Sequence, residues 1–273
     1  MVATGAFDAI DRAAAIIDAL AERGACGVTD LARAVDLSPA TTQRYVKALA
    51  AHRFLERVEP GPRYVLGVRL FELGHIAIRR EVREVARPLM RRLVDQWEET
   101  ANLAARHEKL LVLIDAVETT RPLRMGARVG ERDNWHASAL GKAILAHLPL
   151  TEVENILSGV PMMRLTSRTR TTIPEFLKDL EVVRERGFAV DDREADDGLR
   201  CVGAPIFGPD QTPIYALSLS GPVGRMTEDR VNEMGAQLIE AANTVFREIS
   251  REEAGINRWS PLSARAQDPK KNH

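Results

Sequence analysis

Cysteine is scarce in this sequence of 273 residues, which contains only Cys26 and Cys201, far apart along the chain. Two cysteines at this separation argue against a disulfide framework and against the closely spaced ligand sets of zinc sites. We therefore expect a protein of a reducing compartment, with no bound metal and no cofactor.

Long apolar runs and a strong excess of one charge are also missing. No stretch approaches the roughly 20 consecutive apolar residues that cross a bilayer, and the first residues do not read as a secretory signal. The formal net charge is −1, so any binding to nucleic acid must come from a local basic surface. These absences predict a cytoplasmic protein without membrane contact.

The composition that remains is that of a globular protein, with 45% hydrophobic and 28% charged residues. The length and the changes of pattern along the chain predict two domains, at residues 1–67 and 68–253. The last residues, 254–273, are polar and contain proline, which predicts a disordered tail.

The first domain has the pattern of a winged helix-turn-helix. Apolar residues at helical spacing predict a first helix that ends near Gly24, and the short helix DLARAVD follows with Thr29 as its cap. A third helix begins at Ser38 after a very short link. The runs FLERV and RYVLG flank the turn EPGP, which predicts a β-hairpin with Arg63 beside its tip.

The third helix, SPATTQRYVKALAAHR at residues 38–53, is the candidate recognition helix. Ser38 suits the N-cap, and Pro39 suits the first helical position, where its missing N–H is not needed. If the face that carries Val46 points inward, the opposite face interleaves alanines with Thr, Gln, Arg and Lys side chains. Small residues allow close approach to a surface, and the polar ones are types that reach base edges and phosphates.

The charge distribution supports a DNA-binding role for this region. Between Ser38 and Leu66 there are five basic and two acidic residues, a local charge of +3, so the rest of the chain sums to −4. A basic helix and hairpin on an otherwise acidic protein are typical of phosphate contact. The residues that we expect to contact DNA are Ser38, Thr41, Thr42, Gln43, Arg44, Lys47 and Arg63.

The second domain is predicted to be α+β with one antiparallel sheet, since early strands are joined by short turns and later ones alternate with helices. Two linker helices come first, one at residues 68–83 interrupted by Gly74 and one from Pro88. The predicted strands are NLAARH, LLVLIDAV, PLRMGAR, GFAVDD, CVGAPIF and PIYALSLSG. The predicted helices are SALGKAILAHL, TEVENIL, PEFLKDLEVVRER and a last helix from Thr227 to about Glu253.

Four separated motifs resemble one known family. They are YVLGVRLFELG at 64–74, HASALGKAILA at 136–146, DDREADDGLRCVGAPIF at 191–207 and ALSLSGPVGRM at 216–226. In this order behind a winged helix-turn-helix, over residues 7–250, they are similar to the IclR family of bacterial transcriptional regulators. The resemblance implies a GAF/PAS-like effector domain, a homodimer or homotetramer, a palindromic double-stranded DNA operator and a small carboxylate or aromatic acid as effector, with repression as the expected outcome.

The resemblance also implies an effector site. Carried over by position, its residues are Met125, Ala139, Leu140, Asp191, Leu199, Cys201, Ser218 and Ser220. Alternation on a strand places Ser218 and Ser220 on one face, and alternation alone would turn that face to solvent. The chain departs from the namesake regulator at Ala139, where that regulator has glycine, and at the polar and aromatic stretch Asp133–Trp135, so the ligand need not be glyoxylate or pyruvate.

Other chemistries have weaker support. The run DDREADDG fails as a calcium loop, because Asp197 occupies the position of the turn glycine, and we expect most of its carboxylates to be solvated. Lys142 follows a glycine, but His136 replaces the first glycine of a phosphate loop. The alternative to a regulator is a small-molecule enzyme or sensor that uses Cys201 and Asp191.

Overall fold

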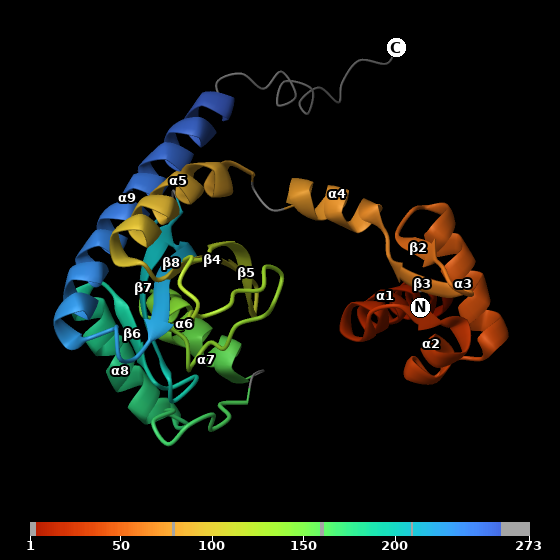
Figure 1. Ribbon diagram of the computed structural model, residues 1–273, viewed down its shortest axis with the longest axis horizontal. Helices are drawn as coiled ribbons and strands as arrows, with labels where there is room; N and C mark the ends of the chain where they lie inside the picture. Colours follow the sequence, from red (N-terminus) through yellow and green to blue (C-terminus); the bar gives the residue numbers. More distant parts are fainter. Residues whose placement is uncertain (1–3, 78–79, 159–160, 209, 258–273) are drawn as a thin grey trace, which may run out of the picture. The chain divides into compact units, whose positions relative to one another are not determined.

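The computed structural model describes residues 4–77, 80–158, 161–208 and 210–257 (Figure 1). The chain divides into two compact units, residues 1–80 and 81–273, each of which is described by itself. The division falls after the helix that follows the hairpin, rather than at residue 67 as the sequence had indicated. That helix belongs to the first unit because the Arg69 N–H donates to the Arg53 carbonyl at 3.2 Å and Glu72 lies 3.6 Å from the Arg53 guanidinium.

The first unit is a winged helix-turn-helix, as predicted. Its small antiparallel sheet has the order β1-β3-β2, and its core is formed by apolar residues such as Ile16, Leu20, Leu31 and Val46. The elements are α1 Thr4–Arg23, β1 Cys26–Gly27, α2 Val28–Ala34, α3 Pro39–Ala51, β2 Leu55–Val58, β3 Arg63–Leu66 and α4 Val68–Ala77.

Three details of the first unit differ from the prediction. Helix α2 begins at Val28 after Gly27, with no side-chain hydrogen bond at its cap, so Thr29 lies inside the helix and does not cap it. Gly74 does not interrupt α4, since the helix runs through it to Ala77. Strand β1 was not expected because two residues are too few to show an alternating pattern.

The second unit is built on one five-stranded antiparallel sheet with the order β5-β4-β8-β7-β6, which confirms the predicted α+β class. Helix α9 covers one face of the sheet, with α5 beside it, and α6 lies against the other face. The elements are α5 Arg80–Trp97, β4 Thr100–His107, β5 Leu110–Val117, α6 Ala139–Leu145, α7 Leu150–Ser158, α8 Ile173–Arg186, β6 Ala189–Asp192, β7 Leu199–Phe207, β8 Pro213–Pro222 and α9 Glu228–Asn257.

Three predictions for the second unit are wrong. Helix α5 begins at Arg80 and contains Pro88, which had been expected to start it. The segment PLRMGAR is a loop, not a strand. Helix α9 continues to Asn257, so residues 254–257 are helical; the rest of the predicted tail lies outside the described residues.

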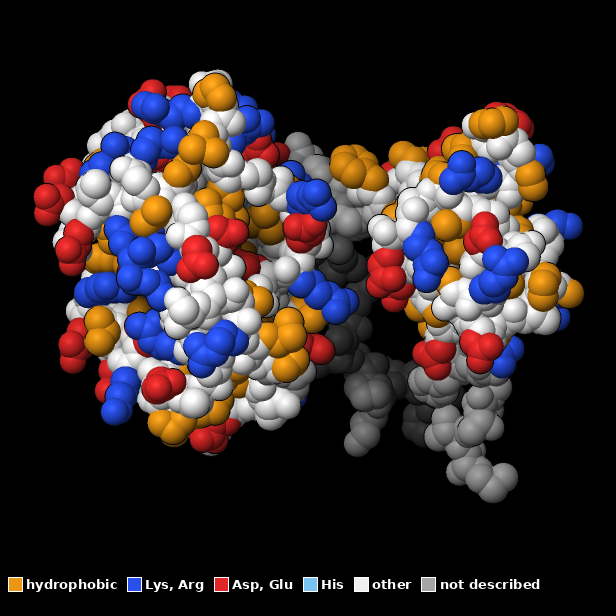
Figure 2. Space-filling view, turned by 60° about the horizontal axis from the view of Figure 1, so that its bottom comes forward, with side chains coloured by type: hydrophobic (Ala, Val, Ile, Leu, Met, Phe, Trp, Pro, Cys, Tyr) orange, Lys and Arg blue, Asp and Glu red, His pale blue; other side chains and the backbone are white. Residues whose placement is uncertain are grey.

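The surface of the second unit is mixed in character. On the face visible in Figure 2, Lys and Arg side chains alternate with Asp and Glu, and hydrophobic side chains lie in small groups. Within the part of the chain that the structure describes, no helix combines the length and the apolar character that a bilayer span requires.

Candidate functional site

Helix α3 is capped and oriented as the sequence predicted. The Ser38 hydroxyl accepts a hydrogen bond from the Thr41 N–H at 3.1 Å and donates to the Thr41 hydroxyl at 2.8 Å, which satisfies one free donor of the first turn. Val46 is fully buried, while Arg44 and Lys47 are exposed on the opposite side. The polar and alanine face of α3 is therefore free to meet another surface.

Thr42 does not belong to that face. Its side chain is fully buried, and its hydroxyl donates to the Ser38 carbonyl at 3.1 Å. The expectation that Thr42 contacts DNA is wrong, because a threonine one turn before Val46 on the inner face stabilises the start of the helix instead.

The hairpin β2–β3 supplies two more exposed cations near its tip. Val58 pairs with Arg63 next to the turn of the hairpin, and Arg57 lies beside them, exposed to solvent. The Arg63 guanidinium is also exposed and donates through one nitrogen to the Ala25 carbonyl, before β1. This bond leaves other N–H groups of Arg63 available. Its contact with DNA stays a prediction.

A cavity of about 130 Å³ lies between the sheet and α6 in the second unit. All eight residues named from the resemblance line it: Met125, Ala139, Leu140, Asp191, Leu199, Cys201, Ser218 and Ser220. They come from four strands or loops and one helix, so the fold brings together positions up to 95 residues apart, from Met125 to Ser220.

The floor of the cavity is a row of polar side chains that crosses four strands. Asp191 on β6 is opposite Cys201 on β7, and Cys201 is opposite Ser220 on β8. On the next strand, β4, Asn102 is opposite Ser218. All five are buried, so the serine face is not solvated as simple alternation had indicated. We call these five residues the polar row.

Asn102 connects the two serines of the polar row. Its side-chain nitrogen lies 3.3 Å from the Ser218 hydroxyl oxygen and 3.2 Å from that of Ser220. Asn102 was not identified from the sequence. The available signal was weak: asparagine is uncommon inside strands, yet here it stands in the apolar run of β4.

The first turn of α6 forms the roof of the cavity. Ser138 caps the helix, as predicted, and accepts from the Gly141 N–H at 3.0 Å. Gly203 on β7 lies directly beneath, where an added Cβ would come within 2.8 Å of the Ala139 carbonyl oxygen. A glycine at 203 therefore allows the helix to approach the sheet closely enough for Ala139 and Leu140 to line the cavity.

One wall of the cavity is the loop between β5 and α6. Eight lining residues come from it: Met125, Gly126, Ala127, Arg128, Glu131, Arg132, Asp133 and the helix cap Ser138. Of the stretch that departs from the namesake regulator, Asp133 lines the cavity and Asn134 is exposed. Trp135 is buried in the core instead, and its indole N–H donates to the Lys109 carbonyl at 2.8 Å.

Asp191 has an unusual environment at one end of the polar row. Burial raises its pKa from 3.8 to about 6, against the opposing effects of the Glu194 N–H and the Lys142 charge. The Glu194 and Ala195 N–H groups donate to its Oδ1 atom at 2.7 and 3.3 Å. These bonds fix the carboxyl group while it faces the cavity.

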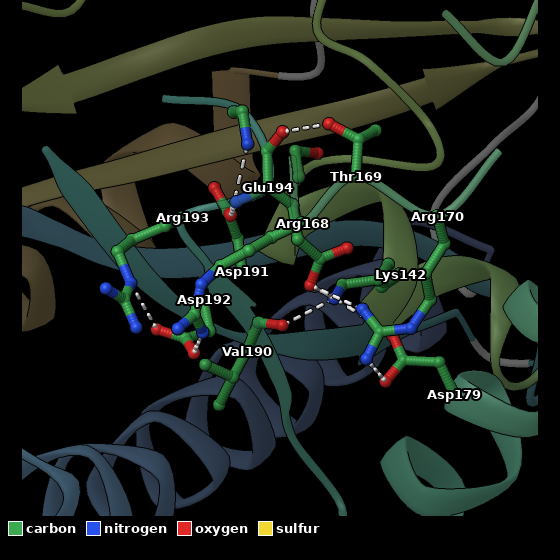
Figure 3. Close-up of polar contacts among 12 residues, drawn as sticks. Lys142, Arg168, Thr169, Arg170, Asp179, Val190, Asp191, Asp192, Arg193 and Glu194 are labelled. Atoms are coloured by element: carbon green, nitrogen blue, oxygen red, sulfur yellow. Dashed lines mark hydrogen bonds and ion pairs between the residues drawn. The ribbon is translucent and has the colours of Figure 1, made fainter. Parts of the chain in front are cut away.

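Behind Asp191 lies a cluster of charges around the buried Lys142 (Figure 3). The fully buried Lys142 ammonium contacts Asp179 at 2.9 Å, Glu194 at 2.6 Å and the Val190 carbonyl at 2.5 Å. Arg170 reaches the same two carboxylates, at 3.1 and 2.7 Å. We call Lys142, Arg170, Asp179 and Glu194 the Lys142 cluster.

The Lys142 cluster corrects the sequence reading of the acidic run. Glu194 is 2% exposed and paired, so it is not a solvated loop carboxylate, although Asp196 and Asp197 are exposed as expected. Lys142 holds Val190 and Glu194, on either side of Asp191, while it sits one turn along α6 from the cavity. The cluster therefore ties two sides of the cavity together.

The structure gives little support to nucleophilic chemistry at Cys201. Burial raises the pKa of its thiol well above the usual value, and the nearby Asp191 charge raises it further, which disfavours the thiolate. His136, which by residue type could serve as a base for the thiol, is buried and bonded through Nε2 to the Met163 carbonyl at 3.0 Å. Among the described residues, no group of three or more His, Cys, Asp or Glu side chains is placed to hold a metal ion.

Comparison with known proteins agrees with both halves of this description. The family described as "IclR helix-turn-helix domain" matches residues 9–59, and "Bacterial transcriptional regulator IclR C-terminal" matches residues 75–247. The chain is 34% identical to the regulator BhcR of Paracoccus denitrificans, over 92% of this chain and 91% of that one. It is 33% identical to the transcriptional repressor IclR of Escherichia coli, over 89% and 90% of the two chains.

Solved structures show the same arrangement. The crystal structure of the Thermotoga maritima IclR is 30% identical, with a TM-score of 0.72 over 89% of this chain and 98% of that one. An IclR homolog from Microbacterium hydrocarbonoxydans, complexed with 4-hydroxybenzoate, shares the fold at 24% identity, with a TM-score of 0.79 over 89% and 99%. Two matching domains in the family's order, with relatives above 30% identity along most of their length, lead to one conclusion: this chain belongs to the IclR family of ligand-responsive, DNA-binding transcriptional regulators.

Proposed function

We propose that this regulator binds a two-fold symmetric operator as a dimer or a dimer of dimers, and that a small carboxylate in the cavity changes its affinity for DNA. The observation that carries the effector part is the polar row, because two buried serine hydroxyls lie on the cavity floor beside the first turn of α6. Hydroxyl groups donate to an anion without the desolvation penalty of a buried cation.

The DNA part rests on α3 and the hairpin. Arg44 and Gln43 are suited to base edges in the major groove, and Lys47 and Arg63 to phosphates. Ser38 and Thr41, at the N-terminus of α3, add short polar groups at the end that enters the groove. Two such helices related by a dimer axis would meet half-sites about one helical turn apart, or a multiple of it.

The size and polarity of the cavity limit the ligand. A cavity of about 130 Å³ is close to the roughly 150 Å³ that accommodates benzene in an engineered protein. By volume the ligand is then an acid of a few carbons; a single substituted ring, such as the 4-hydroxybenzoate of the Microbacterium homolog, is larger than benzene and would extend beyond this volume. Its carboxylate would lie at Ser218 and Ser220, and a hydroxyl at its other end would donate to Asp191.

The mode of action that we propose is repression in the cytoplasm, by binding rather than by turnover. Several relatives are named repressors, among them IclR of Escherichia coli and the acetate operon repressor of Salmonella typhimurium. The competing proposal, an enzyme that uses Cys201 and Asp191, needs a reactive thiolate, which burial of Cys201 opposes. A regulator should return its ligand unchanged after prolonged incubation.

The test separates the two halves of the proposal. Operator fragments are first selected from genomic DNA with the full-length protein, and binding is then titrated with glyoxylate, pyruvate and 4-hydroxybenzoate. Replacing Ser218 and Ser220 together by Ala should abolish the response to the active acid and leave DNA binding without ligand intact. The matched control, Arg44→Ala, should weaken operator binding and leave acid binding to the free protein unchanged.

Two results would contradict the proposal. A serine double variant that still responds to the acid at wild-type concentrations would place the effector elsewhere. A footprint without two-fold symmetry, or a monomeric species on DNA, would refute the dimer.

A further inference from the structure

Asn102 stands out because its amide is buried, lines the cavity and contacts both serines at once. It is 2% exposed, and its two N–H groups reach the hydroxyl oxygens of Ser218 and Ser220 at 3.3 and 3.2 Å. Its carbonyl oxygen Oδ1 has no hydrogen-bond partner among the described residues. The amide therefore uses both of its donors on the serine pair.

The opposite orientation of the amide is less favourable. If Oδ1 faced the serines, two buried N–H donors would lose their partners, whereas the present orientation leaves one acceptor without a partner. With the N–H groups toward the serines, both hydroxyl oxygens act as acceptors from Asn102. Each serine then keeps its own hydrogen for another acceptor.

Little else in the described protein competes for those two hydrogens. The Ser220 hydroxyl has one competing partner, a hydrogen bond with the side chain of Cys201, but a cysteine sulfur is a weak acceptor. The Ser218 hydroxyl has no recorded acceptor among the described residues, although it lies on the cavity floor. The serine pair is thus set to donate toward the cavity, where a ligand oxygen would accept.

We propose that Asn102 is a specificity-determining positioning residue, which fixes Ser218 and Ser220 as hydrogen-bond donors and so fits the cavity to a carboxylate oxygen rather than to an N–H or ammonium group. This rests on the proposed effector function of the same cavity. Without the amide, each hydroxyl is free to rotate and can serve either as donor or as acceptor. In Asn102→Asp a carboxylate replaces the amide, so both serine hydroxyls must donate to the Asp side chain and turn away from the ligand.

The test compares Asn102→Asp with Asn102→Ala in the full-length protein. The probes are two matched pairs, 4-hydroxybenzoate with 4-hydroxybenzamide and pyruvate with pyruvamide, and affinity is measured by calorimetry. The affinity of Asn102→Asp for the acid should fall roughly tenfold or more for each serine donor that is turned away, a loss as large as that of the serine double variant. Asn102→Ala should stay within about tenfold of wild type, because the free serines still donate. The ratio of acid to amide affinity should fall in Asn102→Asp.

The outcomes distinguish this inference from the proposed function. If the serine double variant loses acid binding while Asn102→Asp binds as wild type, the inference is overturned and the effector site stands. Equal losses in Asn102→Ala and Asn102→Asp, with an unchanged acid-to-amide ratio, would indicate a merely structural role and also overturn it. If Asn102→Asp does not fold, Asn102→Ala decides alone: a ratio of acid to amide affinity below that of wild type supports the inference, and an unchanged ratio overturns it. Failure of the wild type to bind any of these acids would overturn both proposals.

Discussion

The raised pKa of Asp191 predicts a pH dependence of folding stability that one substitution can isolate. Burial lifts this pKa from 3.8 to about 6, so the folded protein binds the proton more tightly than the unfolded chain does. The resulting stabilisation is complete below pH 3.8 and is lost as the pH rises through about 6. Above that pH the folded protein holds an ionised carboxylate that is largely removed from water.

The magnitude follows from the two pKa values. The full shift corresponds to about 3 kcal/mol of unfolding free energy, of which about 1.4 kcal/mol falls between pH 8 and pH 5. Asp191→Asn keeps an oxygen that can accept from the Glu194 and Ala195 N–H groups but cannot titrate. We therefore expect the stability of wild type relative to Asp191→Asn to rise by about 1.4 kcal/mol from pH 8 to pH 5.

The measurement is urea unfolding of the full chain at several pH values, followed by tryptophan fluorescence. Trp97 and Trp135 are both buried in the second unit, and they report on its transition. Comparison with wild type cancels the titration of groups that do not interact with Asp191. The matched control is Asp197→Asn in the same loop, which makes the same chemical change at an exposed side chain. A constant difference between wild type and Asp191→Asn across this range would refute the assigned burial of the charge.

Three further predictions concern other parts of the chain. Arg44→Ala should weaken operator binding by about 1–3 kcal/mol and relax specificity at one base. Lys47→Ala should weaken binding to all DNA sequences alike and flatten its salt dependence. Both effects are measured by titrating DNA binding at graded salt concentrations. Lys142→Met should lower the unfolding free energy by about 3–5 kcal/mol, because it leaves the buried Glu194 carboxylate and the partly buried Asp179 carboxylate to Arg170 alone; a loss below about 1 kcal/mol in urea unfolding would contradict the geometry. Gly141→Ala should destabilise by about 1–3 kcal/mol, since its Cβ would lie 2.5 Å from the Trp135 carbonyl oxygen; wild-type stability in the same urea unfolding would count against this close contact.

Local features of the chain could be predicted from the sequence because their causes are local. The Ser38 and Ser138 caps, the hairpin turn and the outward face of α3 depend on residues within a turn or two of each other, and the structure has all of them. The errors at Thr29 and Pro88 are also local, since several residues near a helix start can serve its first turn and α5 accommodates a proline.

The pairing of distant residues was not available from pattern alone. Ser218 and Ser220 share a face by alternation, but Leu217 and Leu219 on the other face are equally buried, so alternation could not tell which face was covered. The contact between Lys142 and Glu194 spans 52 positions, and nothing near either residue indicates the other. The effector positions came from the resemblance to a family, and Asn102, which no motif contained, was missed.

The loop that forms one wall of the cavity bears on how the ligand specificity of such a regulator can change during evolution. The polar row and α6 are embedded in the sheet and the Lys142 cluster, so substitutions there disturb folding as well as recognition. Arg128, Glu131 and Arg132 instead have exposed side chains on a connecting segment, yet they line the same cavity. Substitutions at residues 125–133 therefore change the folding stability little. Descendants of one scaffold can acquire new ligands through this short segment while the polar row and helix α3 are inherited intact.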